Sequence, residues 1–140
     1  MSGLVTTEVS ERPPFGLRIT ARCAVVVAFG LARLSPGGLR QVLRFISARA
    51  RPAGHEQALR ARKAVVAASV RCAGPWCLPR SIATALLCRV GGTWPDWHTG
   101  VCVEPFRAHA WVVADGQPVG ESGAVSLVSF RSVIVVRAVR

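Results

Sequence analysis

The chain has 140 residues, of which 51% are apolar, enough for one domain with one hydrophobic core and too apolar for a disordered protein. Its five cysteines are too few for a disulfide scaffold and their odd number leaves one unpaired, so we expect a reducing, cytoplasmic environment. The net charge is +11, and because most of the excess lies in residues 1–70, that half suits an acidic protein or peptide partner better than nucleic acid.

The start of the chain does not have the pattern of a signal peptide or a membrane anchor. Residues 1–20 contain Glu8, Glu11 and two consecutive prolines where a signal peptide would have its apolar region. The best apolar segment, residues 23–32, is interrupted by a glycine and is shorter than the ~20 residues that a membrane span requires. We therefore expect neither export nor a membrane span.

Helical patterns occupy most of the first 90 residues. Residues 18–34 suit either a strand or a buried helix, and we favour a helix. Apolar residues at positions i, i+3, i+4 and i+7 predict an amphipathic helix over residues 39–50. An alanine-rich helix is expected over residues 56–72. A further helix is expected over residues 77–89, with Pro79 in its first turn.

After the glycines at positions 91 and 92 the apolar pattern changes to a period of two, which is typical of strands. We expect strands at residues 99–103, 108–113, 118–121, 125–130 and 132–139. The segment before them, residues 94–98, is interpreted as an exposed loop. Helices followed by an antiparallel sheet predict an α+β fold, with the helices of the first half packed on the sheet.

Cys77 is the cysteine with a reactive setting. At the N-terminus of a helix, free backbone N–H groups and the helix dipole favour the thiolate, and Arg71 and Arg80 add positive potential. A thiolate is a nucleophile, and a nearby imidazole can take the proton of the thiol. The remaining cysteines lack this setting and are expected to be small buried residues: Cys23, Cys72, Cys88 and Cys102.

His109 lies between two alanines on a predicted strand and shares one strand face with Trp111 and Val113. A lone histidine on a strand is usually structural. A general base would require this face to meet the helix that carries Cys77. Ala108 and Ala110 point the other way, where small side chains let a neighbouring element approach closely.

Three segments together resemble a known family. The segments CLPRSIATALL (residues 77–87), FRAHAWV (residues 106–112) and GQPVGE (residues 116–121) resemble the lasso-peptide leader peptidases, which are papain-related, transglutaminase-like cysteine proteases. The likeness covers about residues 71–121. It implies a papain-like domain in which Cys77 is the nucleophile, His109 is the base and an acidic residue completes a triad that removes the leader from a ribosomally made precursor.

The resemblance also implies an organisation and a set of partners. Residues 1–70 would form a helical N-terminal portion with a partner-docking surface, and residues 71–140 the catalytic core, together one domain. We expect no leader-binding module before the core, as in the split form in which a separate small leader-recognition protein delivers the precursor. The lasso cyclase would be a functional neighbour. No cofactor is implied.

Glu121 falls at the third position of the triad, where the family usually has aspartate. Asp115 is the rival, but it lies roughly 20 Å from His109 along one strand and belongs to a hairpin-turn signal. A two-residue turn there would pair Ala110 with Glu121, on the wrong face. A three-residue loop would pair Trp111 with Glu121, on the same face as His109. The Glu121 assignment therefore predicts the longer loop or a bulge.

Around the two motifs, Trp76, Arg80 and Trp111 are expected to contact substrate, although the tryptophans are also explained by packing. The backbone N–H of Cys77 is expected to bind the oxyanion. His98 could act with Asp96, but the cysteines and histidines lack the close paired spacings of a zinc site, so we expect no metal.

Three other functions stay open from the sequence. The same triad can transfer the acyl group to an amine, as in a transglutaminase. A catalytically silent site would leave a peptide-binding scaffold of the same fold. An arginine-rich surface could bind nucleic acid, with steep dependence on salt.

Overall fold

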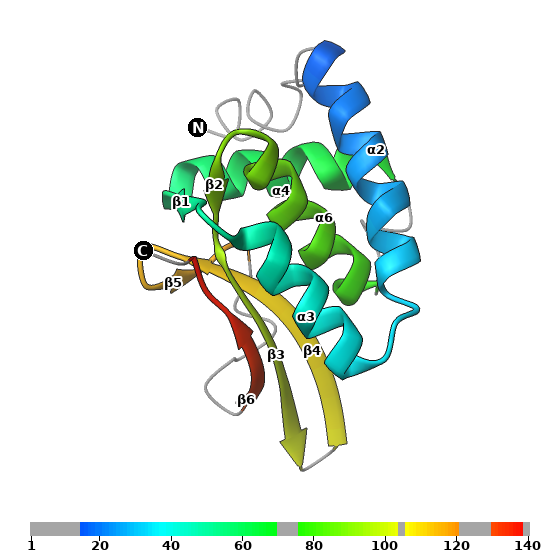
Figure 1. Cartoon of the computed structure of the whole chain (residues 1–140), viewed down its shortest axis with the longest axis vertical. Coiled ribbons are helices and arrows are strands. Elements are labelled where there is room, and N and C mark those ends of the chain that lie inside the picture. The colour runs from blue at the N-terminus through cyan, green and yellow to red at the C-terminus, as the bar shows by residue number, and fades with distance from the viewer. Residues whose placement is uncertain (1–14, 70–75, 104–105, 121–129, 139–140) are drawn as a thin grey trace, which may run out of the picture.

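The computed structural model describes residues 15–69, 76–103, 106–120 and 130–138. In these ranges the chain forms helices α2 (Phe15–Leu31), α3 (Pro36–Ser47), α4 (His55–Ala68) and α6 (Cys77–Val90). An antiparallel sheet contains strands β3 (Asp96–Val103), β4 (Phe106–Ala114), β5 (Gln117–Pro118) and β6 (Arg131–Val136). The α+β fold expected from the sequence is confirmed, with the helices gathered on one side of the sheet (Figure 1).

The helices agree with the sequence patterns to within a few residues at each end. The segment that suited either a strand or a helix is α2. Helix α3 begins after Ser35, whose hydroxyl accepts a hydrogen bond from the backbone N–H of Gly38 at 3.2 Å. At the other end of α3, the Arg89 Nε–H donates to the carbonyl of Ile46 at 2.7 Å. This bond satisfies a carbonyl in the last turn of α3 and ties that turn to the end of α6.

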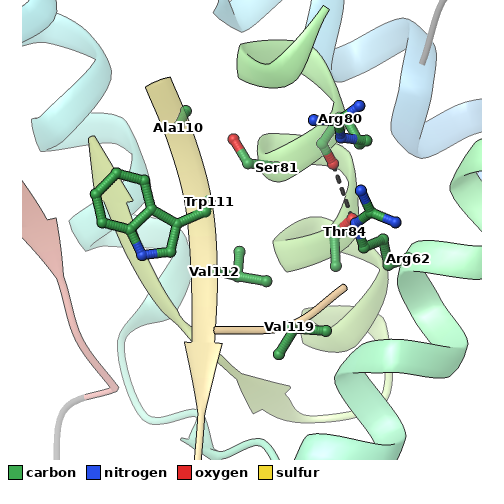
Figure 2. Close-up of a pocket in the computed structure, with 8 residues that line it drawn as sticks. All are labelled: Arg62, Arg80, Ser81, Thr84, Ala110, Trp111, Val112 and Val119. Carbon is green, nitrogen blue, oxygen red and sulfur yellow. Dashed lines mark hydrogen bonds between the residues drawn. The ribbon is translucent and has the colours of Figure 1, made fainter. Parts of the chain in front are cut away.

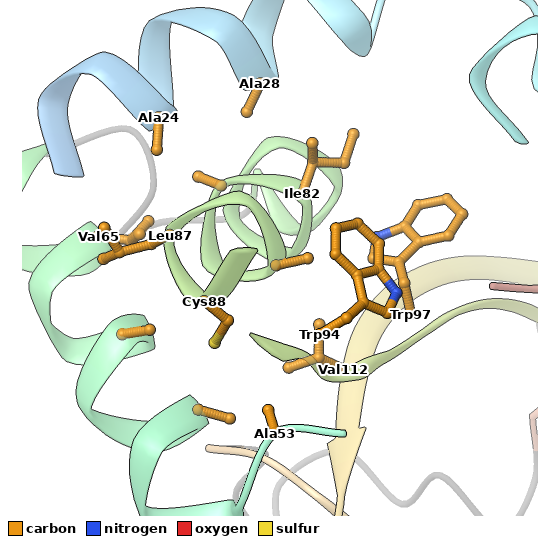
Figure 3. Packing of buried hydrophobic residues seen from close by; sticks show 14 of the residues in the cluster. Ala24, Ala28, Ala53, Val65, Ile82, Leu87, Cys88, Trp94, Trp97 and Val112 are labelled. Carbon is orange, nitrogen blue, oxygen red and sulfur yellow. The ribbon is translucent and has the colours of Figure 1, made fainter. Parts of the chain in front are cut away.

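Helix α6 lies against strand β4 and contacts α2 and α4, whereas α3 packs on β6 (Figure 1). A helix buried on most sides must be apolar or small on most sides. The buried residues of α6 are small or apolar, apart from the hydroxyl groups of Ser81 and Thr84. They are Pro79, Ser81, Ile82, Ala83, Thr84, Ala85, Leu87 and Cys88. Figure 3 shows Ala24 and Ala28 of α2 and Val65 of α4 around this helix.

The sheet has the strand order β5-β4-β3-β6, and every pairing in it is antiparallel. Strand β3 pairs with β4 along its whole length, and its pairing with β6 contains an irregularity between Thr99 and Gly100. The expected strand over residues 125–130 lies almost wholly outside the described residues, and Phe130 precedes β6. A further pair, β1 (Arg51–Pro52) and β2 (Thr93–Trp94), is parallel and was not predicted.

The interpretation of residues 94–98 as an exposed loop is wrong. Trp94 belongs to β2, Trp97 belongs to β3, and both side chains are fully buried. Each indole N–H has an internal acceptor: Trp94 Nε1 donates to the carbonyl of Val136, and Trp97 Nε1 to the Ser81 hydroxyl, both at 3.0 Å. These bonds remove the cost of burying the polar edge of a tryptophan, so both rings join the core (Figure 3).

Among the described residues, we find no helix with the length and apolar character that crossing a bilayer would demand.

Candidate active site

The site begins with the position of Cys77 at the first residue of α6. The preceding residue, Trp76, provides no side-chain cap, and the first turn contains no acidic residue. The thiol therefore lies in the positive field of a helix N-terminus without a competing carboxylate in that turn. Its exposure is intermediate, so it is shielded from bulk water but remains open to a reactant.

Two groups of β4 contact the thiol: the side chain of His109 and the backbone of Ala110, both through hydrogen bonds. The backbone explains the second bond. Residues two apart on a strand direct their N–H and C=O groups to the same edge. The carbonyl of Val112 accepts from Val119 N–H at 2.9 Å, so Ala110 directs its N–H to that same edge, away from β3. Cys77 therefore lies at the edge of β4.

The pKa of the Cys77 thiol is lowered. Burial is the largest single influence and would by itself raise this pKa. The hydrogen bonds to His109 and Ala110 and the positive charges of His109 and Arg80 act in the opposite direction and together outweigh it. A lowered pKa increases the thiolate fraction near neutral pH, which is what a nucleophilic cysteine requires.

The other described cysteines have different settings. Cys88 is buried in the core, and burial raises its pKa to about 12, so it is the inert apolar residue that the sequence predicted. Cys102 has intermediate exposure. Cys23 is exposed on α2, which contradicts the expectation that it is buried. The reason is that Ala21, Ala24 and Ala28 form the buried side of α2. Cys72 lies outside the described residues.

His109 is held by a stack of aromatic rings. The ring of Trp111 lies nearly parallel to the imidazole of His109, with centroids 5.8 Å apart, and nearly parallel to the imidazole of His98, with centroids 5.5 Å apart. Phe130 packs against both His109 and Trp111. These contacts fix the plane of the His109 imidazole, so a catalytic proton transfer would begin from one ring orientation.

Gly100 makes room for this stack. It lies opposite His109 in the register of β3 and β4. A Cβ atom at this position would lie 2.8 Å from Cη2 of Trp111 and 2.8 Å from the carbonyl oxygen of Arg131. The sequence analysis did not select Gly100, although an isolated glycine in a strand pattern is the usual signal of a close approach.

The sequence analysis expected the strand face with His109 and Trp111 to meet the helix that carries Cys77. This expectation is wrong. Ala110 and Val112 face α6 across a cavity of about 10 Å³, whereas the indole of Trp111 lies on the other side of β4 (Figure 2). The face with Ala110 and Val112 meets the helix because small and branched side chains let α6 approach the sheet closely. Cys77 still reaches His109 because it begins the helix at the strand edge.

The turn after β4 also differs from expectation. Val113 pairs with Pro118 and Ala114 with Gln117, so the loop has two residues, Asp115 and Gly116, both with positive φ. This is the geometry of a primed hairpin turn, which Asp-Gly favours. Of the longer loop or bulge that the Glu121 assignment predicted, the longer loop is therefore not formed. Glu121 itself lies outside the described residues.

Asp115, the rival third residue, has a different contact. Its carboxylate accepts a hydrogen bond from the backbone N–H of His55 at 2.8 Å. His55 is the first residue of α4, so Asp115 satisfies one of the donors that a helix N-terminus leaves free. Asp115 therefore joins the hairpin to α4.

The three residues that were expected to contact substrate have different surroundings in the structure. Arg80 contributes positive charge at Cys77 and lines the small cavity of Figure 2 with Trp111. Trp76 is half-exposed and packs against Phe29 of α2, with centroids 6.1 Å apart. Trp111 is 6% exposed, and it packs against His98, His109 and Phe130, so the structure gives it a packing position beside His109.

His98 is not placed as a partner of Cys77. Its Nδ1 lies 3.2 Å from the hydroxyl of Ser132. Its pKa is lowered, first by burial and also by the charge of Arg137, against an opposing effect of Asp96. Within the described ranges, no three potential metal ligands come together.

Comparison with known protein families identifies the family of this chain. The family described as the transglutaminase-like superfamily matches residues 21–135, most of the chain. The chain belongs to the transglutaminase-like superfamily. Neither curated proteins nor solved structures give a match. The superfamily includes cysteine proteases and acyl transferases, both of which use a thiol nucleophile. The transglutaminase-like domain thus contains, at one strand edge, a cysteine and a histidine suited to such chemistry.

Proposed function

We propose that this transglutaminase-like domain is a cysteine peptidase in which Cys77 is the nucleophile and His109 the general base. The observation that carries the proposal is the hydrogen bond between these side chains, at the start of α6, together with the lowered pKa of the thiol. A cysteine in this setting is a nucleophile near neutral pH, and an adjacent imidazole can receive and return a proton.

The reaction follows from these two groups. His109 takes the thiol proton, and the Cys77 sulfur forms a bond to the carbonyl carbon of the peptide. The negative charge that develops on the carbonyl oxygen is stabilised by the backbone N–H of Cys77. His109 then gives its proton to the leaving nitrogen as the C–N bond breaks. Water, deprotonated by His109, attacks the thioester and releases the carboxylate, restoring the thiol.

The substrate we propose is the precursor of a lasso peptide, cleaved between leader and core. The support is the resemblance of residues 71–121 to the leader peptidases, in which Cys77 and His109 occupy the matching positions. A separate small leader-recognition protein would deliver the precursor, with the basic residues 1–70 as its docking surface and the lasso cyclase as the next enzyme. Glu121 remains the proposed third residue, and Trp76, Arg80 and Trp111 the proposed substrate contacts.

The test is mass spectrometry of a lasso precursor, incubated with this protein and the leader-recognition protein from the same gene neighbourhood. We expect cleavage at one bond, lost in Cys77→Ala and His109→Ala. Cys23→Ala is the matched control, because Cys23 is exposed and belongs to a different helix. The Glu121→Ala variant tests the third residue. Cleavage that survives Cys77→Ala would show that another group is the nucleophile.

Two other results would point to the other functions. A product with the mass of an amide, formed when an amine is present, would indicate acyl transfer. An intact precursor in a verified complex with the wild-type protein would indicate a silent peptide-binding scaffold.

A further inference from the structure

The imidazole of His98 is a group to which the proposed reaction gives no role. His98 lies opposite Trp111 in the register of β3 and β4, so the two side chains share one face of the sheet. This face is turned away from α6, as the position of the indole in Figure 2 shows. The His98 imidazole is half-buried and lies nearly parallel to the indole. His98 therefore contacts a ring that also stacks on the proposed base, His109.

Gly100 determines how the three rings are arranged. It lies opposite His109, two residues along β3 from His98. The atoms that a Cβ at position 100 would meet include Cη2 and Cζ3 of Trp111, at 2.8 Å and 3.1 Å, so the indole extends over this glycine. The indole thus runs diagonally from β4 to β3. His109 lies on one side of it, on β4, and His98 lies on the other side, on β3.

The His98 ring is itself held by β6. Ser132 pairs with Gly100 in the register of β3 and β6, and its hydroxyl lies 3.2 Å from Nδ1 of His98. The stack on the indole fixes the plane of the imidazole, and the hydrogen bond to Ser132 fixes its rotation within that plane. An ordered His98 leaves the indole of Trp111 little room to turn away from His109.

The charge of His98 also suits this position. Burial is the largest influence on its pKa and lowers it, while the charge of Asp96 acts to raise it and the charge of Arg137 to lower it. The net effect lowers the pKa, so His98 is neutral at pH 7. When the Cys77 thiol gives its proton to His109, an imidazolium forms against the electron-rich face of the indole. A neutral His98 adds no competing positive charge to the stack.

We propose that His98 is a positioning residue for the reaction, which holds the indole of Trp111 against the imidazole of His109 and is itself held by Ser132. The proposal rests on the proposed function, because it requires His109 to be the base. It adds that the orientation of the base depends on the neighbouring strands β3 and β6, and is transmitted through a ring that lies between the two histidines.

Loss of the His98 ring has a measurable consequence at Cys77. The indole would gain room to turn, and His109 would spend less time in the orientation that bonds to the thiol. Because that bond lowers the pKa of the thiol, the thiolate would form at higher pH. Iodoacetamide reports this directly: the thiolate displaces iodide, so an S–C bond forms and a C–I bond breaks. Peptide mass spectrometry then gives the rate for Cys77 alone at each pH.

Three variants test the proposal through the pH at which Cys77 is alkylated at half its maximal rate. We expect His98→Ala to raise this midpoint by about 0.5 pH unit, so that alkylation well below the midpoint is about threefold slower. His98→Phe keeps a ring that can stack on the indole, and its midpoint should stay within about 0.2 pH unit of the wild type. Ser132→Ala removes the hydrogen bond but not the ring, so its midpoint should lie between those of the wild type and His98→Ala.

Val136→Ala is the matched control for a loss of stability. Val136 is 2% exposed and pairs with Trp97, so it lies on the same strand as Ser132 but on the opposite face of the sheet. Truncating it should lower Tm and leave the alkylation midpoint unchanged. Circular dichroism shows which variants are folded, and if His98→Ala is not, Ser132→Ala and His98→Phe provide the test.

The outcomes separate the two proposals. If iodoacetamide modifies wild-type Cys77 no faster than the exposed Cys23, the thiol is not activated, and the proposed function fails together with this inference. If wild-type Cys77 reacts rapidly and His98→Ala and Ser132→Ala have the wild-type midpoint, the positioning role is refuted and the peptidase proposal stands. A midpoint in His98→Phe as high as in His98→Ala, or an equal rise in Val136→Ala, would also refute it.

Discussion

Gly100→Ala should destabilise the protein and disturb His109, although it adds only one methyl group. The new Cβ would lie 2.8 Å from Cη2 and 3.1 Å from Cζ3 of Trp111, and 2.8 Å from the carbonyl oxygen of Arg131. Ordinary contacts of a Cβ atom begin at 3.4 Å. The indole or the backbone of β6 must therefore move by about half an ångström. The indole cannot move alone, because His98, His109 and Phe130 pack against it.

The expected cost follows from the packing. Adding a methyl group to a filled site costs about 1–3 kcal/mol, and the lower chain entropy of alanine in the unfolded state offsets about 0.4–1 kcal/mol. The net loss is therefore about 1–2 kcal/mol, which lowers Tm by roughly 3–10 °C for a domain of this size. Thermal unfolding followed by circular dichroism measures it.

A positioning role predicts a second effect. Because the displaced indole is stacked on His109, the hydrogen bond to Cys77 should weaken and the pKa of the thiol should rise. The pH at which iodoacetamide modifies Cys77 at half its maximal rate would then shift upward. A purely structural role for Gly100 would lower Tm and leave this pH profile unchanged.

Gly30→Ala is the matched control. It is the same substitution within α2, where an added Cβ has nothing within 4 Å, and replacing a helical glycine should stabilise the protein by up to about 1 kcal/mol. If Gly100→Ala has the Tm and pH profile of the wild type, the close packing of Gly100 against Trp111 and its role in holding His109 are both refuted.

Three further predictions concern single contacts. His109→Ala removes the hydrogen bond and the positive charge that lower the Cys77 pKa but leaves its burial, so the pKa should rise and the alkylation midpoint should move to higher pH; an unchanged midpoint would contradict the pairing. Cys88, whose pKa burial raises to about 12, should resist iodoacetamide at pH 8 until the protein is denatured, and labelling of the folded protein would show that it is accessible. Asp115→Ala should cost at least about 1 kcal/mol in a denaturant titration, because it removes the acceptor for His55 N–H and places alanine at a positive φ, whereas Asp115→Asn should retain most of the stability; equal losses in both variants would argue against this bond as a cause.

Much of the helical half could be predicted from local patterns. Each helix lies close to its expected range because its start and end depend on neighbouring residues, as with Ser35 before α3 and the two glycines after α6. Cys77 could be selected for the same reason, because its position at a helix N-terminus can be recognised from Pro79 and the apolar spacing that follows. The Asp-Gly turn was also recognisable, although the longer loop, one of the two arrangements that would accommodate Glu121, is not formed.

What the sequence could not decide was how the elements face one another. Residues 94–98 were interpreted as an exposed loop because nothing nearby in the sequence indicates that Trp94 and Trp97 are buried. Their hydrogen-bond acceptors, Val136 and Ser81, are distant in the chain. The face of β4 that meets α6 depends on which side chains let a helix approach, and that is settled only when both elements pack. By itself the sequence determined which residues can react and where helices begin. The tertiary structure decided which groups meet, because contacts between distant segments depend on packing and on available space, and neither is encoded in any short stretch of the chain.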